Sequence, residues 1–278
     1  MHTEVSTGIM VETVDLPSEA LQRTITINFY GPAQLPADNT LGLLLLNDGQ
    51  DVEAMGFDKM IGYLLQTETI KPMLCVGIHS GEERSLEYGM ISSPDFKGRG
   101  AKAGLYRQFI LEELLPFIHT RYHEFTFNET AFAGFSLGGL SALDIVWNHQ
   151  DVFSKVGVFS GSLWWRSKDR KEKDFNEATD RLMHRQIRQG SYNPRLKFFF
   201  EAGELDETED RNGNNVIDSI DDTIDLMREL LAKGWKEGKD MRYLQLPDGK
   251  HDIRSWAKGL PVFLKWGWRK PQRATPDA

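Results

Sequence analysis

The sequence predicts a single α/β domain whose mainly parallel sheet is covered by helices on both faces. Strand-like and helix-like segments alternate along most of the 278 residues, which is the pattern of parallel α/β folds. Several strand-like segments are continuous apolar runs, as strands buried on both faces are. No linker, repeat or low-complexity tract divides the chain. We therefore expect one domain over residues 1–278, with a loose tail at about 270–278.

The first part of the chain predicts an antiparallel edge of this sheet. Residues 5–15 and 21–30 read as strands with no helix between them, and polar and apolar residues alternate in the second. Further strands are expected at 41–46, 73–78, 130–133, 156–159, 196–200 and 241–246, about eight in all. Helices are expected near 53–66, 105–122, 140–147, 172–189, 220–232 and 252–267.

Composition excludes several classes of protein. The net charge of −8 argues against nucleic acid as the main partner. No apolar run approaches the roughly eighteen residues that a membrane helix needs, so no membrane partner is expected. The first residues have neither a basic start nor an apolar core, which predicts a cytoplasmic location, although a trimmed secretory chain would start the same way. The single cysteine, Cys75, lies in an apolar run and predicts a buried, inert thiol.

The most informative motif is Gly134-Phe135-Ser136-Leu137-Gly138, between a predicted strand and a predicted helix. A serine in Gly-x-Ser-x-Gly at such a junction is typical of a nucleophile elbow, where a sharp turn exposes the hydroxyl at the end of the sheet. Glycines flank the serine because the turn leaves no room for Cβ atoms. The alternative is a tight turn with a purely structural role.

A serine nucleophile needs a histidine base, and on this architecture the order along the chain is serine, acid, histidine. Of the seven histidines, four precede Ser136. His149 ends the helix after the elbow, and His184 lies in a charged helix that predicts a surface position. His251 follows the last predicted strand directly, where this class of fold keeps its chemistry. We therefore expect His251 to be the base.

The acid is expected after the strand at 196–200. That loop offers Glu201, Glu204, Asp206 and Glu207, of which Glu201 is still close to the strand. Asp206 is favoured and Glu204 comes second, since spacing alone separates them poorly.

An oxyanion hole needs two N–H donors. The loop after the strand at 41–46 contains Gly49, which allows the N–H of Gln50 to turn toward the serine. The second donor would be the N–H of Leu137, directly after the nucleophile. The alternative for this loop is an ordinary turn.

Five segments carry a family resemblance. The chain resembles the esterase D-like group of α/β-hydrolases, and within it the enterochelin (siderophore) esterase branch, in LNDGQ (46–50), AGFSLGG (133–139), SGSLWW (160–165), EAG (201–203) and GKHD (249–252). The resemblance spans roughly residues 15 to 267. It implies the α/β-hydrolase fold, Ser136, Asp206 and His251 as nucleophile, acid and base, and Gln50 and Leu137 as the oxyanion hole.

Two further residues are candidates for binding the substrate. Trp164 follows a predicted strand and could line an acyl or aryl pocket, or pack in the core together with Trp165. Arg84 could hold an anionic group of the substrate, or form a surface ion pair. The segment 166–195, rich in Lys and Arg, predicts a solvated cap helix.

Residues 210–221 match much of a twelve-residue calcium loop. The candidate ligands are Asp210, Asn212, Asn214, the Val216 carbonyl and Asp221. Position six is Asn215, which tolerates a left-handed conformation. The alternative is an acidic turn that caps the helix beginning near Ile220.

Together these features predict a serine carboxylic-ester hydrolase that acts through an acyl-enzyme and needs no organic cofactor. Its small-molecule substrate would be a siderophore ester or an aryl or acyl sugar ester. Two alternatives stay open: an acyltransferase that uses the same triad, and a ligand-binding module without turnover on the same scaffold.

Overall fold

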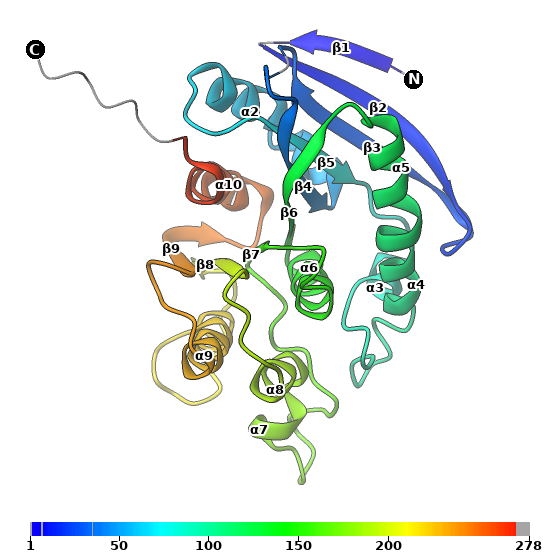
Figure 1. Cartoon of the computed structure of the whole chain (residues 1–278). Helices are drawn as coiled ribbons and strands as arrows, with labels where there is room; N and C mark the ends of the chain where they lie inside the picture. The colour runs from blue at the N-terminus through cyan, green and yellow to red at the C-terminus, as the bar shows by residue number, and fades with distance from the viewer. Residues whose placement is uncertain (1, 7, 35, 271–278) are drawn as a thin grey trace, which may run out of the picture.

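The computed structural model describes residues 2–6, 8–34 and 36–270, with side chains from residue 8 onward. Within them, nine strands form one sheet in the order β1-β2-β3-β5-β4-β6-β7-β8-β9 (Figure 1). The strands from β4 to β9 pair in parallel, and β1, β2 and β3 add an antiparallel edge that joins at β5. The predicted mostly parallel sheet with an antiparallel edge is confirmed. The strand bounds are β1 (His2–Ser6), β2 (Ile9–Ser18), β3 (Arg23–Pro32), β4 (Thr40–Asn47), β5 (Met73–Ile78), β6 (Thr126–Phe135), β7 (Lys155–Phe159), β8 (Lys197–Leu205) and β9 (Met241–Lys250).

The strand predicted at 5–15 is two strands, which raises the predicted count of eight to nine. β1 ends at Ser6 and β2 begins at Ile9, and these two residues pair across the hairpin. Gly8 has φ of +82° in the turn, a conformation that glycine adopts readily. A short edge hairpin of this kind leaves little trace in hydrophobic periodicity.

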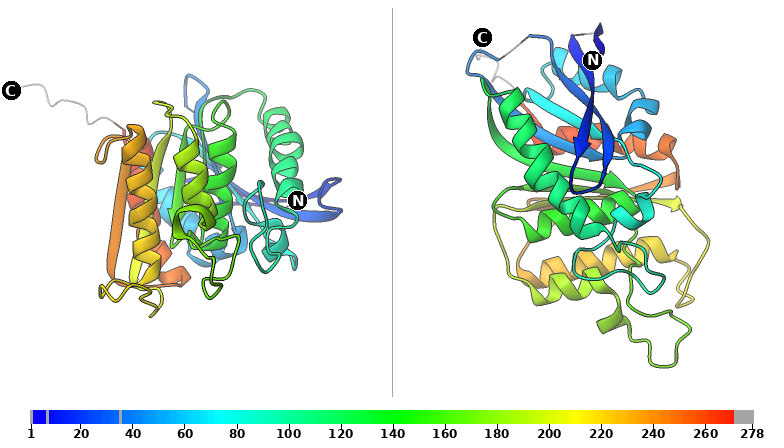
Figure 2. Two further views of the ribbon diagram at one scale, coloured as in Figure 1. Left: turned by 90° about the horizontal axis from the view of Figure 1, so that it is seen from below. Right: turned by 90° about the vertical axis from the view of Figure 1, so that its right-hand side faces the viewer.

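Helices cover both faces of the sheet, as predicted (Figures 1 and 2). One face carries α1 (Gly49–Ala54), α2 (Phe57–Gln66) and α10 (Ile253–Trp268), and the other carries the remaining helices. These are α3 (Arg84–Glu87), α4 (Ala103–Gln108), η1 (Phe109–Leu114), α5 (Leu115–Arg121), α6 (Leu137–Asn148), α7 (Glu177–Asp180), α8 (Leu182–Gln189) and α9 (Asp218–Lys233). No helix in the described residues has both the length and the apolar character that crossing a membrane requires.

The apolar run in β4 shows why the central strands read as continuous hydrophobic segments. Leu43 and Leu45 pack in the core beneath α5 and α6, whereas Leu44 and Leu46 pack in the core beneath α2 and α10. Successive side chains point to opposite faces of a strand, so a strand covered on both faces needs apolar residues at every position.

Three predicted helices differ from those observed. The helix predicted at 53–66 breaks at Gly56, and the helix predicted at 105–122 contains the π-helical segment η1. The charged segment at 172–189 forms only α7 and α8. The expected surface position of His184 is wrong, because α8 packs against α9 and buries His184. The predicted loose tail lies outside the described residues, except for Lys270.

Candidate active site

The predicted catalytic residues gather at the carboxyl end of the sheet, the side on which the parallel strands β4 to β9 end. Ser136 follows β6, Asp206 follows β8 and His251 follows β9. In an open parallel sheet, this is the end where ligands bind.

The elbow at Ser136 has the strained geometry that the motif predicts. Ser136 adopts φ of 53° and ψ of −120° between β6 and α6, outside the regions that an L-residue prefers. Such a conformation costs about 1–3 kcal/mol and persists where the surroundings hold it. A Cβ atom on Gly134 would lie 2.4 Å from the carbonyl carbon and oxygen of Gly138, so only glycine fits beneath the turn. The Ser136 carbonyl accepts the N–H of Ser162 at 3.0 Å, and their two Oγ atoms lie 3.5 Å apart.

Asp206 and His251 lie beside each other because of the register between β8 and β9. Leu205 pairs with Lys250 in these parallel strands, and each candidate is the next residue along its chain. Asp206 accepts the N–H of Gly203 at 3.1 Å. Glu204 is exposed and accepts from the Gln245 side chain at 2.8 Å, on β9. Asp206, rather than Glu204, therefore acts electrostatically on His251.

Burial and charge shift the pKa values of this pair. Burial lowers the pKa of His251, the charge of Asp206 opposes that shift, and the charge of Arg84 adds to it. Burial also raises the pKa of Asp206, while hydrogen bonds from the Gly203 N–H and the Ser160 hydroxyl, and the charge of His251, offset part of the rise. A lowered pKa keeps the imidazole neutral near pH 7, the form that a general base needs.

A row of aromatic rings connects His251 with the elbow. The Trp256 ring, on α10, stacks on Phe135 with 5.2 Å between centroids. The His251 ring meets the same tryptophan edge to face at 5.3 Å. Because Phe135 directly precedes Ser136, Trp256 fixes the imidazole relative to the residue before the nucleophile. The structure thus brings together elements that are more than 100 residues apart in the sequence.

The loop after β4 makes its turn one residue earlier than expected. Asp48, not Gly49, adopts the left-handed conformation, with φ of 58° and ψ of 52°. Asp tolerates that region. Gly49 is required instead by packing, since a Cβ there would lie 2.6 Å from the carbonyl carbon of Gly77 on β5.

This loop is tied to the elbow. The Asn47 side-chain amide donates to the carbonyl of Gly138 at 2.8 Å. The Gln50 side chain is held by Ser80 through bonds of 2.8 and 3.1 Å. Gln50 and Leu137 lie in the first turns of α1 and α6, so neither N–H has a partner within its own helix. Both are in the position that an oxyanion donor needs, and their role stays a prediction.

Arg84 forms an ion pair beneath the site. Its Nε and Nη2 donate to the two carboxylate oxygens of Asp48 at 2.6 and 2.7 Å, and the guanidinium lies over the Tyr88 ring. Asp48 is 1 % exposed and Arg84 33 %. Arg84 was expected either to bind a substrate anion or to form a surface ion pair. The structure contains an ion pair, but its acid, Asp48, is buried and not on the surface. Binding of a substrate anion by Arg84 stays a prediction.

Trp164 lines a cavity of about 250 Å³, to which the segments that follow β7 and β8 both contribute. Trp164 comes two residues after Ser162, and Glu207, which also lines the cavity, comes directly after Asp206. Trp165, by contrast, is fully buried in the core. Sequence reasoning missed the rest of the aromatic and cationic wall, because these residues lie in loops without a recognisable motif: Phe96, Lys97, Arg99 and Arg166.

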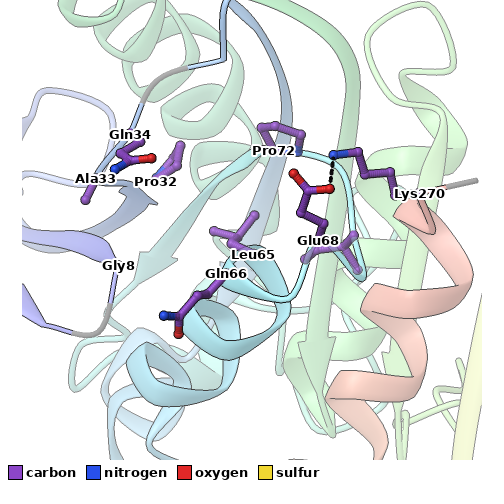
Figure 3. A pocket seen from close by; sticks show the side chains of 10 residues that line it. Gly8, Pro32, Ala33, Gln34, Leu65, Gln66, Glu68, Pro72 and Lys270 are labelled. Atoms are coloured by element: carbon purple, nitrogen blue, oxygen red, sulfur yellow. Dashed lines mark ion pairs between the residues drawn. The ribbon is translucent and has the colours of Figure 1, made fainter. Parts of the chain in front are cut away.

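Larger cavities lie at the amino end of the sheet. One of about 510 Å³ lies where β5 begins and α10 ends, lined among others by Leu65 and Pro72 (Figure 3). Glu68 and Lys270 form an ion pair of 3.0 Å beside it. Among the described residues that line it, none is a predicted site residue.

The candidate calcium loop is closed by its own hydrogen bonds. Asn215 has φ of 65°, the left-handed conformation expected at position six. The Asp210 carboxylate accepts the backbone N–H groups of Gly213, Asn214 and Asn215 at 2.8 to 3.2 Å. The Asp221 carboxylate accepts from the Asn212 and Asn214 amides at 2.8 and 3.0 Å. The described residues hold no group of three or more His, Cys, Asp or Glu side chains placed for a metal ion, so calcium binding stays a prediction.

The chain is similar to known proteins both in family and in fold. The family model described as "Putative esterase" matches residues 18–266. The enterobactin esterase FES from Shigella flexneri, in a crystal structure with enterobactin, has a TM-score of 0.72 at 20 % identity, over 95 % of this chain and 59 % of that one. The siderophore hydrolase EstB from Aspergillus nidulans has a TM-score of 0.67 at 15 % identity, over 98 % and 99 % of the two chains. A ferulic acid esterase has a TM-score of 0.64 at 18 % identity, over 92 % and 96 %.

These similarities confirm the α/β-hydrolase fold. The chain spans somewhat more than half the length of the enterobactin esterases that it matches. The family match covers nearly the whole chain, from β2 into α10. The chain therefore belongs to this esterase family.

Proposed function

We propose that the protein hydrolyses carboxylic esters through an acyl-enzyme formed on Ser136. One observation carries the proposal: the strained turn that exposes Ser136 stands at the same end of the sheet as the neighbouring pair Asp206 and His251. Family membership supports the reaction class.

The chemistry follows from the roles of these groups. Ser136 Oγ attacks the ester carbonyl carbon while the neutral His251 imidazole takes its proton. The N–H groups of Gln50 and Leu137 stabilise the negative oxygen of the tetrahedral intermediate. When the intermediate collapses, the ester C–O bond breaks and the departing alcohol takes the proton from His251. A water molecule then repeats the sequence on the acyl-enzyme, which releases the acid and restores Ser136. Asp206 orients the imidazole and stabilises its cationic form.

The cavity beside Trp164 supports an ester whose acyl or alcohol part is aromatic and electron-rich or anionic. The Arg99 guanidinium lies 4.5 Å from the centroid of Trp164, while Lys97 and Arg166 lie 5.5 and 5.8 Å from that of Phe96. Nε of Arg166 is buried without a hydrogen-bond partner in the described structure. The faces of Trp164 and Phe96 can pack against an aryl ring, and Lys97 and Arg166 can attract an anionic substituent of that ring. The same cavity is also lined by carboxylates, of which Glu209, Asp218 and Asp222 pair with Arg170 and Arg211. Enterobactin and ferulic acid, the compounds named for the similar proteins, are aromatic. We therefore propose siderophore or aryl esters as substrates.

The reaction class is tested by hydrolysis of short p-nitrophenyl esters. The wild type should release p-nitrophenol, and Ser136→Ala should reduce the rate to background. Equal rates for the two proteins would refute the role of Ser136. Adding an alcohol as an acceptor and analysing the products distinguishes hydrolysis from acyl transfer.

The substrate class is tested with a siderophore trilactone, a feruloyl sugar, an acetyl sugar and a simple acyl ester compared side by side. Arg166→Gln should raise KM for the aryl esters and leave the acetyl ester unchanged. Lys173→Gln, at an exposed position of the same basic segment, is the matched control. Equal kcat/KM for aryl and acetyl esters in every variant would contradict the role of the cavity.

We also propose that the loop 210–221 binds a calcium ion that stiffens the segment after Asp206. The left-handed Asn215 and the convergence of Asn212, Asn214 and Asp221 support it.

A further inference from the structure

A second carboxylic acid lies buried behind Asp206. Glu201 is on β8, is 1 % exposed, and has Oε2 at 3.5 Å from Ser160 Oγ. Its Oε1 has no hydrogen-bond partner within the described structure. A buried acid with an unpaired oxygen calls for an explanation, because leaving a buried polar atom unpaired is costly.

Ser160 connects Glu201 with the residues that hold His251. Its Oγ accepts the indole N–H of Trp256 at 3.0 Å, and Trp256 is the ring against which His251 packs. The same hydroxyl lowers the pKa of Asp206, whose buried Oδ1 has no hydrogen-bond partner within the described structure. Ser160 is itself strained, with φ of 44°, and its N–H donates to the Glu201 carbonyl at 2.8 Å. Ser160 is therefore a buried residue that interacts with Glu201, Trp256 and Asp206, and not part of a surface turn.

The hydrogen-bond count favours a neutral Glu201. A serine hydroxyl donates one hydrogen bond and accepts two. If Glu201 and Asp206 were both ionised, they would compete for that single hydrogen. If Glu201 carries a proton, Glu201 and Trp256 can both donate to Ser160, and the Ser160 hydroxyl can then donate to the unpaired oxygen of Asp206.

We propose that neutral Glu201 is a positioning residue, which turns the Ser160 hydroxyl toward Asp206 and thereby holds the acid that orients His251. The inference rests on the proposed ester hydrolysis. It gives Ser160 and Glu201, which open two of the segments that carry the family resemblance, a role in positioning Asp206.

The electrostatics of the surroundings agree with this role. Burial first, and then the charge of Asp206, raise the pKa of Glu201 to about 8. Two titratable groups interact electrostatically with Glu201: Asp206 and, on β9, Tyr243. From α10 it meets Gly259, and from β7 it meets Ser160, neither of which is charged. Ionisation of Glu201 would add a negative charge beside Asp206 and draw the hydrogen of Ser160 away, so activity should decline as pH rises through about 8.

The pH profile of kcat/KM for p-nitrophenyl acetate tests the inference, with the Ser136→Ala rate subtracted at each pH. Glu201→Gln keeps a neutral donor toward Ser160 and cannot ionise. It should keep activity within about twofold of wild type at pH 7 and lose the decline above pH 8. Glu201→Leu removes the donor and should lower kcat about tenfold with KM little changed. Glu237→Gln, at an exposed acid shortly before β9, should keep the wild-type profile.

Two results would overturn the inference while leaving the proposed function intact: a Gln variant that keeps the alkaline decline, or a folded Leu variant with wild-type kcat. If the Leu variant does not fold, as circular dichroism would show, the Gln profile still decides. A wild type without activity on any ester would instead overturn the proposed function itself.

Discussion

The two ends of the sheet differ in what they offer. The amino end has larger cavities, of about 510 and 550 Å³, and the first is lined by prolines and aliphatic side chains together with the ion pair of Glu68 and Lys270. The carboxyl end has a smaller cavity, a strained Ser136, and buried oxygens of Asp206 and Glu201 that lack partners in the described structure. Catalysis needs polar groups fixed toward the reacting atoms, which cavity volume does not measure. Backbone strain and unpaired buried polar atoms locate this site better than empty space does.

The largest expected effect is the loss of the nucleophile. Ser136→Ala should lower kcat/KM for a p-nitrophenyl ester by about 10⁶-fold, since the acyl-enzyme can no longer form. Glu68→Gln, at the amino end, should stay within about twofold of wild type. Similar losses of kcat/KM in the two variants would show that the two ends of the sheet do not differ in their importance for catalysis.

Next in size is the loss of the acid. Asp206→Asn should lower kcat by about 10³- to 10⁴-fold, because the imidazole loses the charge that orients it and stabilises its cation. Glu204→Gln serves as the control, since its carboxylate is exposed and bonds only to Gln245 in the described structure. Steady-state kinetics that showed the larger loss in the Glu204 variant would assign the acid to Glu204 instead.

A moderate effect is expected at the ion pair between Arg84 and Asp48, which lies in the loop after β4. Arg84→Gln leaves the buried Asp48 carboxylate without its charged partner, which should cost about 1–3 kcal/mol in the free energy of unfolding. It should also lower kcat several-fold for neutral and anionic esters alike. Urea denaturation and kinetics measure both, with exposed Arg254→Gln as the control. A rise in KM for anionic esters alone, at unchanged stability, would show that Arg84 binds substrate.

The pH dependence of kcat/KM tests the role of His251 as the base. Burial holds the pKa of His251 below its usual value of 6.5. The base acts when neutral, so kcat/KM should be maintained as pH falls to 6.5 and should decline below it. In the Glu201→Gln variant this acidic decline should remain. An acidic midpoint above 6.5 would contradict a base whose pKa is lowered, as that of His251 is.

The smallest effect concerns calcium. Added Ca²⁺ should raise Tm by a few degrees, because an ion that binds only the folded protein stabilises it. Asp221→Asn should abolish that shift, whereas Glu68→Gln should retain it. A shift that is equal in both variants, or absent from the wild type by calorimetry, would contradict the calcium loop.

Features of the candidate site that depend on residues close together in the sequence could be predicted. Gly134 and Gly138 reveal the elbow because the close approach of two backbone segments permits only glycine. The place of His251 at the carboxyl end of the sheet could be predicted because this residue directly follows a strand. The left-handed Asn215 was also expected from its position in the loop.

Other features depend on partners far away in the chain. Trp256 reaches Ser160 across 96 residues, so no local pattern shows that Ser160 joins two acids. Glu201 reads as one of several acids after a strand until β7, β9 and α10 bury it. His184 was misplaced for the same reason, since the charges of α8 do not show that α9 covers one of its faces.

The most direct test of the account is to label the protein with a fluorophosphonate and locate the adduct by mass spectrometry of the digested chain. The account predicts one adduct, on the peptide that contains Ser136, and slower labelling in His251→Ala. Absence of labelling, or an adduct on another serine with Ser136 unmodified, would contradict the claim that the carboxyl end of this sheet holds an activated nucleophile.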